Sequence, residues 1–67
     1  MRMAGPETNT SKVVARLRRD GWQGHPGGRH DVYKHPDRKG RIIVPHHRTL
    51  SPGVAREIAK VAGWKDQ

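Results

Sequence analysis

The 67-residue sequence contains no cysteine. That absence excludes a disulfide framework, a thiol nucleophile and any zinc site that depends on cysteine ligands. No apolar run approaches the roughly 20 residues that a membrane-spanning helix requires. The first nine residues also lack the apolar stretch of a signal peptide, so we expect a cytoplasmic protein.

Acidic residues are scarce: 6 Asp and Glu stand against 14 Lys and Arg, which gives a formal net charge of +8. An excess of this size is best explained by a polyanionic partner, either nucleic acid or an anionic membrane surface. The expected helices carry small aliphatic side chains and not the broad apolar face of a membrane-surface helix. Nucleic acid is therefore the favoured partner.

The chain is long enough for one domain and too short for a deep pocket. A domain of this size buries only about 60% of the surface that its unfolded chain exposes. We therefore expect any chemistry on an open face, with a large partner forming the other wall of the site. Residues 1–9 are predicted to be a disordered lead-in, and residues 10–67 a single domain.

Apolar residues within the domain fall into periodic segments. Thr10 or Ser11 is expected to cap the first helix. Tyr33 is the best core candidate among the strand residues. Turn residues fill 36–40, which we predict to be a hairpin connection. The predicted elements are a helix over about 11–20, strands over about 22–24, 29–35 and 41–44, and a helix that starts at Ser51-Pro52 and closes at Gly63.

This order predicts an α+β fold, α-β-β-β-α, with a three-stranded antiparallel sheet. Both helices are expected on one face of the sheet, which leaves the other face open. Ile42 and Val44 are expected to face inward, and Trp64 to fold back on the last helix.

Five histidines occur at positions 25, 30, 35, 46 and 47, all in predicted strands or loops. Imidazole is a common metal ligand. However, no pair has the helical three- or four-residue spacing of a metal-binding motif, and no carboxylates cluster with them, so we predict no metal site. We interpret His25 as a solvated residue and His35 as a strand-end residue whose ring packs on the hairpin.

His30 is the candidate catalytic residue. It follows a Gly-Gly turn and lies on the strand face opposite Tyr33, so it is expected to project from the open side of the sheet. An imidazole can take or give a proton near neutral pH. Arg29 beside it and Lys34 on the same face could hold a scissile phosphate and stabilise its developing charge.

The basic residues of the second half of the chain are candidates for nucleic-acid contact. The plain alternative is a solvated charged surface. If the hairpin pairs as predicted, cations from 38–41 and 46–48 form one stripe near His30. The candidate RNA-binding residues are Arg29, Lys34, Arg38, Lys39, Arg41, His46, His47 and Arg48.

Residues 27–36, Gly-Gly-Arg-His-Asp-Val-Tyr-Lys-His-Pro, resemble the HicA toxins of bacterial type II toxin–antitoxin pairs. Gly-Trp at 21–22, Arg-Ile-Ile-Val-Pro-His at 41–46, and the closing helix with Leu50-Ser51-Pro52-Gly53 and Ala62-Gly63-Trp64 extend the similarity over about 11–64. The Gly-x-His-x-x-Tyr-x-His-Pro core carries most of the resemblance.

The resemblance implies a double-stranded-RNA-binding-like fold and an mRNA interferase that a HicB antitoxin neutralises. His30 occupies the position of the family's catalytic histidine. Arg29 stands where family members often have serine, which questions any role for a hydroxyl there. The implied reaction is cleavage of RNA without a metal or other cofactor, in which the ribose hydroxyl attacks phosphorus. Lys34 and His46 are the candidates for a second proton-transfer group.

Two alternatives remain open. The first is a non-catalytic RNA-binding module of the same fold, in which His30 only contacts phosphate. The second is a DNA-binding helix-turn-helix protein, which is disfavoured because three strands separate the two helices. RNA cleavage by the purified protein in chelator distinguishes the ribonuclease from the binding module.

Overall fold

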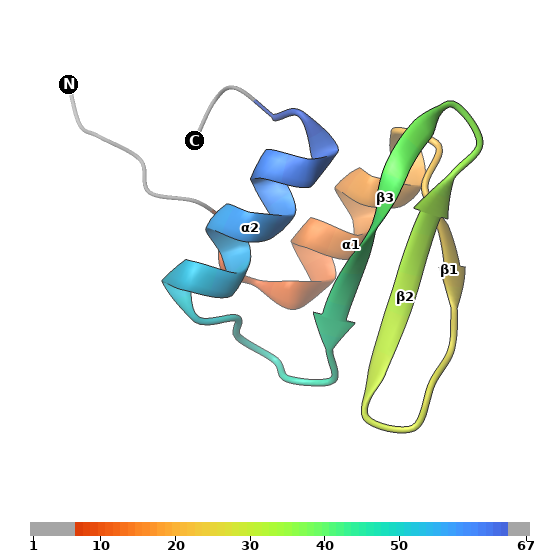
Figure 1. Ribbon diagram of the computed structural model, residues 1–67. Coiled ribbons are helices and arrows are strands. Elements are labelled where there is room, and N and C mark those ends of the chain that lie inside the picture. The colour runs from red at the N-terminus through yellow and green to blue at the C-terminus, as the bar shows by residue number, and fades with distance from the viewer. Residues whose placement is uncertain (1–6, 65–67) are drawn as a thin grey trace, which may run out of the picture.

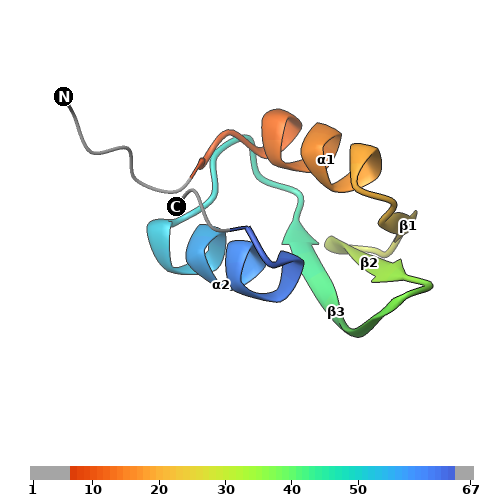
Figure 2. The same ribbon diagram turned by 90° about the horizontal axis from the view of Figure 1, so that it is seen from above.

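The computed structural model describes residues 7–64 and has the predicted element order, helix, three strands, helix (Figure 1). The elements are α1 (Thr10–Arg19), β1 (Gln23–His25), β2 (His30–His35), β3 (Arg38–Pro45) and α2 (Pro52–Ala62). The strands form one antiparallel sheet in the order β1-β2-β3. Both helices lie on the same side of this sheet (Figure 2). The α+β prediction is therefore confirmed.

The second hairpin is tighter than predicted. Only 36–37 form the turn, and β3 begins at Arg38, so 38–40 belong to the strand and not to the connection. Two local features accommodate the short turn. The β2–β3 register shifts between Lys34 and His35. Gly40 adopts a positive φ of 83°, a backbone conformation that residues with a Cβ rarely adopt.

Asn9, and not Thr10 or Ser11, caps α1. Its side chain accepts a hydrogen bond from the backbone N of Lys12 at 3.1 Å. An isolated bridge to Thr49 holds Asn9 in an extended conformation, and the hydroxyl of Thr10 donates instead to the carbonyl of His47. The predicted cap of α2 is confirmed, because Ser51 Oγ accepts from the backbone N of Val54 at 3.2 Å.

The end of the predicted lead-in that the structure describes, 7–9, is joined to the loop before α2. The backbone N of Leu50 donates to the carbonyl of Thr8 at 2.8 Å, and the backbone N of Thr10 donates to the carbonyl of Arg48 at 3.0 Å. Residues 1–6 of the lead-in and 65–67 of the predicted domain lie outside the described residues.

The core lies between the sheet and the two helices. Its largest fully buried side chains come from the first helix and two strands: Val13 and Leu17 from α1, Tyr33 from β2, and Ile42 and Val44 from β3. Burial of each large apolar side chain contributes roughly 1.5–3 kcal/mol. The inward positions predicted from strand alternation are confirmed.

The ends of the two helices meet through Asp20. The indole Nε1 of Trp64 donates to Asp20 Oδ2 at 2.8 Å, and the guanidinium of Arg16 lies 4.3 Å from the centre of the Trp64 ring. The Trp64 side chain therefore contacts the end of α1, whereas the sequence predicted that it folds back on the last helix. Trp22 is buried, but it precedes β1 and its backbone N donates to the carbonyl of Leu17, so it belongs to the end of α1. Within 7–64, no helix is long and apolar enough to cross a membrane.

Candidate active site on the open face of the sheet

The strand register determines which side chains leave the sheet on the side without helices. Tyr33, Ile42 and Val44 are buried beneath the helices, and side chains alternate between the two faces of a strand. The residues between them therefore point away from the helices. We call this surface the open face; it consists of Gln23 and His25 on β1, His30, Val32 and Lys34 on β2, and Arg41, Ile43 and Pro45 on β3.

His30 is the first residue of β2 and is exposed on the open face. Its cross-strand partner is Pro45, and the next pair on this face is Val32 with Ile43, which is 46% exposed. His30 thus lies at one end of a short apolar strip. An exposed imidazole beside an apolar floor can exchange protons with a substrate laid across the sheet.

The turn between β1 and β2 packs closely on the backbone of His30. A Cβ on Gly27 would stand 2.5 Å from the carbonyl oxygen of His30, whereas a Cβ on Gly28 would meet nothing within 4 Å. The backbone amide of Gly27 also contributes to the lowered pKa of the Asp31 carboxyl group. Gly27 therefore lets the turn close tightly where His30 enters the strand.

Asp31 and His46 form a hydrogen bond beside the site. Nε2 of His46 lies 2.8 Å from Asp31 Oδ1, and both side chains are partly exposed. This hydrogen bond is the main reason that the pKa of Asp31 lies below its usual value, with Gly27 and Arg18 lowering it further. Asp31 pairs with the buried Val44, so this hydrogen bond lies on the helix side of the sheet. His46, a predicted second proton-transfer group, is therefore held away from the open face.

The cations predicted to form one stripe are divided between the two ends of the β2–β3 hairpin. Lys34 and Arg41 pair with each other on the open face and are exposed. Arg38 and Lys39 lie beyond them, at the opposite end of the hairpin from His30. The Arg38 guanidinium packs on the end of α2, where a Cβ on Gly63 would stand 2.8 Å from Nη1. The stripe does not form because the eight-residue β3 separates its two parts.

Residues 46–48 lie at the same end of the sheet as His30. The backbone N of His46 donates to the carbonyl of Arg29 at 3.2 Å, which continues the β2–β3 pairing by one residue. The carbonyl groups of His47 and Arg48 accept hydrogen bonds from Thr10. The loop is therefore anchored on both sides, and the side chains of Arg29, His47 and Arg48 are exposed beside it.

The remaining histidines differ in their surroundings. His35 is structural, as predicted: its Nδ1 accepts from the backbone N of Asp37 and its Nε2 donates to the carbonyl of Asp20, both at 3.0 Å. Its ring also meets Trp22 edge-on. His25 is exposed on the open face. Among residues 7–64, no three His, Asp or Glu side chains are grouped closely enough to hold a metal ion.

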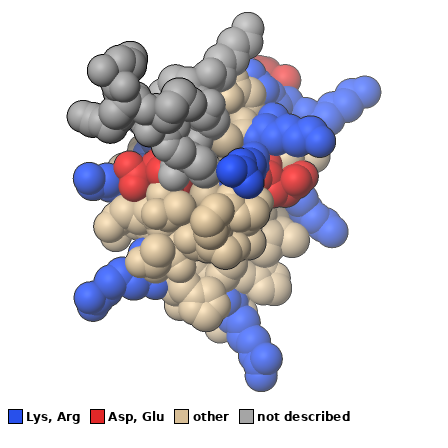
Figure 3. Space-filling view, turned by 90° about the vertical axis from the view of Figure 1, so that its left-hand side faces the viewer, with Lys and Arg blue, Asp and Glu red and all other residues tan. Residues whose placement is uncertain are grey.

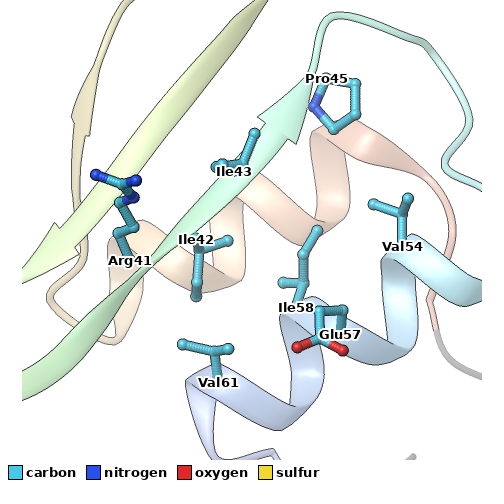
Figure 4. Close-up of a pocket in the computed structure, with 8 residues that line it drawn as sticks. All are labelled: Arg41, Ile42, Ile43, Pro45, Val54, Glu57, Ile58 and Val61. Carbon is cyan, nitrogen blue, oxygen red and sulfur yellow. The ribbon is translucent and has the colours of Figure 1, made fainter.

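The helix side of the molecule has a different character. Figure 3 shows uncharged residues across the middle and lower part of this side, with Asp and Glu side chains on its two flanks and Lys and Arg side chains mainly toward its edges. A groove of about 310 Å³ runs between β3 and α2 (Figure 4). Because β3 is an edge strand of the sheet, residues of both of its faces border the groove. The lining consists of Arg41, Ile43 and Pro45 from the open face, together with Ile42, Val54, Glu57, Ile58 and Val61. The groove is mainly apolar and contains no histidine.

Two residues that shape the site were not singled out from the sequence. Asp31 is the only acidic residue within the histidine-rich 21–36 stretch. That isolated negative charge among histidines was the sequence feature that could have identified it. Its partner His46 lies 15 positions away, and only the strand register brings the two together. The sequence does not distinguish Gly27 from Gly28. They differ in the space available for a Cβ, because the His30 backbone approaches only Gly27 closely.

The fold and the site match one known family. The family model described as the HicA toxin of bacterial toxin–antitoxin systems matches residues 10–64. A search of the curated proteins found no match to the chain. The matched segment runs from the first residue of α1 to Trp64 and contains every residue of the open face. The chain therefore belongs to the HicA toxin family and is the toxin of a toxin–antitoxin system.

Proposed function

We propose that this toxin is a metal-independent endoribonuclease that cleaves mRNA with His30 as its catalytic residue. One observation carries the proposal. In a chain of the HicA family, a histidine that follows a tight glycine turn is exposed at the start of β2, on the face that the helices leave uncovered. An RNA strand is large enough to cover the open face and so to form the other side of this site.

The proposed reaction uses a group that RNA itself provides. The ribose 2′-hydroxyl attacks the adjacent phosphorus, and His30 takes the hydroxyl proton as general base. The P–O5′ bond breaks, which leaves a cyclic phosphate and a free 5′-hydroxyl. DNA lacks the attacking hydroxyl, so the chemistry alone selects RNA.

The proposed RNA path follows the open face. Lys34 and Arg41 lie on that face, and Arg29 with the 46–48 loop borders His30. These cations can contact the phosphates on either side of the cleavage point, largely without regard to sequence. Arg38 and Lys39, at the far end of the hairpin, would contact only a longer RNA. An mRNA substrate agrees with the expected cytoplasmic location.

The proposed inhibitor is a HicB-type antitoxin. A toxin–antitoxin family implies a protein partner, and the net charge of +8 favours an acidic one. An acidic protein laid across the open face would block RNA access to His30.

The test is cleavage of RNA by the purified protein in the presence of chelator. We expect cleavage by the unmodified chain and a loss of about 100-fold or more in His30→Ala. His30→Ala purified in the same way is also the control for contaminating nuclease. Glu57→Gln, exposed on α2, is the control for substitution itself and is expected to retain full activity. A folded His30→Ala that binds RNA more weakly, together with an unmodified chain that never cleaves it, supports the alternative, a non-catalytic RNA-binding module.

A further inference from the structure

A single histidine leaves the proposed cleavage incomplete. The attacking 2′-oxygen must lose a proton, and the departing 5′-oxygen must gain one. His30 can serve only one of these atoms in each cleavage event. The site therefore needs a second group that exchanges protons and reaches the other side of the same phosphate.

The two groups expected from the sequence do not fit this position. Nε2 of His46 is engaged by Asp31, which lies on the helix side of the sheet. Lys34 shares the open face with His30 but lies four residues farther along β2. At about 3.3 Å per residue, the two Cα atoms are roughly 13 Å apart. Strand side chains stand roughly perpendicular to the sheet, so Lys34 would have to lean far along the strand to contact a phosphate held by His30.

His25 does fit it. The β1–β2 register pairs His25 with Val32, and His30 is two residues from Val32 on the same strand and the same face. His25 and His30 are therefore diagonal neighbours across two adjacent strands. Such positions are roughly 7–8 Å apart, within reach of aromatic side chains. Both side chains are exposed, so a phosphate can enter between the two rings.

The register is supported by an independent contact next to His25. A Cβ on Gly24 would stand 2.8 Å from the buried ring of Tyr33, which places residue 24 on the helix side. Alternation then directs His25 to the opposite, open face. The turn that joins the two strands approaches the His30 backbone closely at Gly27, just beyond this pair.

We infer that His25 is the general acid of the site and protonates the leaving 5′-oxygen while His30 deprotonates the 2′-hydroxyl. This inference rests on the proposed ribonuclease function. The bond from the 2′-oxygen to phosphorus forms as the P–O5′ bond breaks. One proton passes to His30 and one leaves His25, so the products are a 2′,3′-cyclic phosphate and a 5′-hydroxyl. Water returns the two histidines to their starting protonation states.

The role is tested with two versions of one oligoribonucleotide that contains a mapped cleavage site. One has the natural 5′-oxygen at that site, and the other has sulfur in its place. The departing thiolate needs no proton, so a general acid matters only for the natural RNA. We expect His25→Ala to lose about 100-fold or more on the natural RNA and to stay close to the unmodified protein on the sulfur RNA. His30→Ala is expected to lose activity on both.

Glu57→Gln, exposed on α2 and outside the open face, is the control and is expected to cleave both RNAs as the unmodified chain does. Circular dichroism establishes that the variants are folded. Full cleavage of natural RNA by His25→Ala overturns the inference and leaves the proposed function intact. Equal losses on both RNAs overturn it too, because they indicate a binding or structural role. An unmodified chain that cleaves neither RNA overturns the proposed function itself.

Discussion

The carboxylate of Asp31 accepts a hydrogen bond from Nε2 of His46 at 2.8 Å, and this contact joins the start of β2 to the loop that follows β3. The neighbouring backbone bond from His46 to Arg29 spans the same gap. Both contacts flank His30 without using its side chain. These contacts therefore stabilise the site from the helix side of the sheet, and the side chains of the catalytic candidates, His25 and His30, remain exposed on the open face.

This contact predicts a pH-dependent contribution to stability. The pKa of Asp31 lies below its usual 3.8, mainly because of His46. The folded state therefore binds this proton less readily than the unfolded state. The stabilisation is complete above the usual pKa and is lost as pH falls through the lowered one. We expect Asp31→Asn to lower the free energy of unfolding at pH 6, with a difference from the unmodified protein that shrinks by pH 3.

Urea unfolding of both proteins at the two pH values measures this difference. Asp37→Asn, an exposed aspartate in the hairpin turn, is the matched control for the loss of one carboxylate. A difference for Asp31→Asn that is as large at pH 3 as at pH 6 would contradict the assigned role of the carboxylate.

Gly27 and Gly28 offer a matched pair of substitutions. A Cβ on Gly27 meets the His30 carbonyl at 2.5 Å, and backbone cannot move aside as a flexible side chain can. We expect Gly27→Ala to cost about 1–3 kcal/mol of stability and to lower RNA cleavage by displacing His30. Gly28→Ala has open space and is expected to be neutral or to stabilise by about 0.4–1 kcal/mol. Chemical unfolding measures the stability of the two variants, and a cleavage assay measures their activity. Equal results for both variants would refute the close packing of Gly27 on the His30 backbone.

The fold was largely predictable because its signals are local. Alternation placed Tyr33, Ile42 and Val44 inward, and Ser51 and Gly63 marked the ends of α2. The start of β3 was not predictable, because turn-type residues at 38–40 pair in the strand beside the register shift at Lys34. The site was only partly predictable for a related reason. The contacts within the site depend on which residues pair across neighbouring strands, and that register cannot be determined from amino-acid composition.

His25 illustrates that limit. In the sequence it stands beside Pro26 and resembles an ordinary solvated residue. Its position diagonal to His30 follows only from the pairing of His25 with Val32. Arg38 shows the reverse case, because it belongs to a basic cluster in the sequence yet packs on the end of α2 at Gly63.

The open face predicts a steep salt dependence of RNA binding. With a 2′-O-methyl RNA that cannot be cleaved, we expect the log–log slope of affinity against salt to correspond to roughly three to six phosphate contacts. Lys34→Gln is expected to reduce that slope by about one. Arg56→Gln, exposed on α2, is the matched control and is expected to leave it unchanged. Equal effects of the two variants would argue against the open face as the RNA path.

The last prediction concerns inhibition by the antitoxin. Within 7–64, the connections between the helices and strands are short, and none covers the open face. We expect inhibition to come from a bound partner, and the net charge of +8 favours fast association with an acidic protein. We expect the interface to include Arg29, Lys34 and part of 46–48. Hydrogen exchange of the free and bound toxin then shows protection in β2 and in the loop after β3. If protection is confined to α1 and α2, the antitoxin acts at a distance from His30, and direct blocking of the site is wrong.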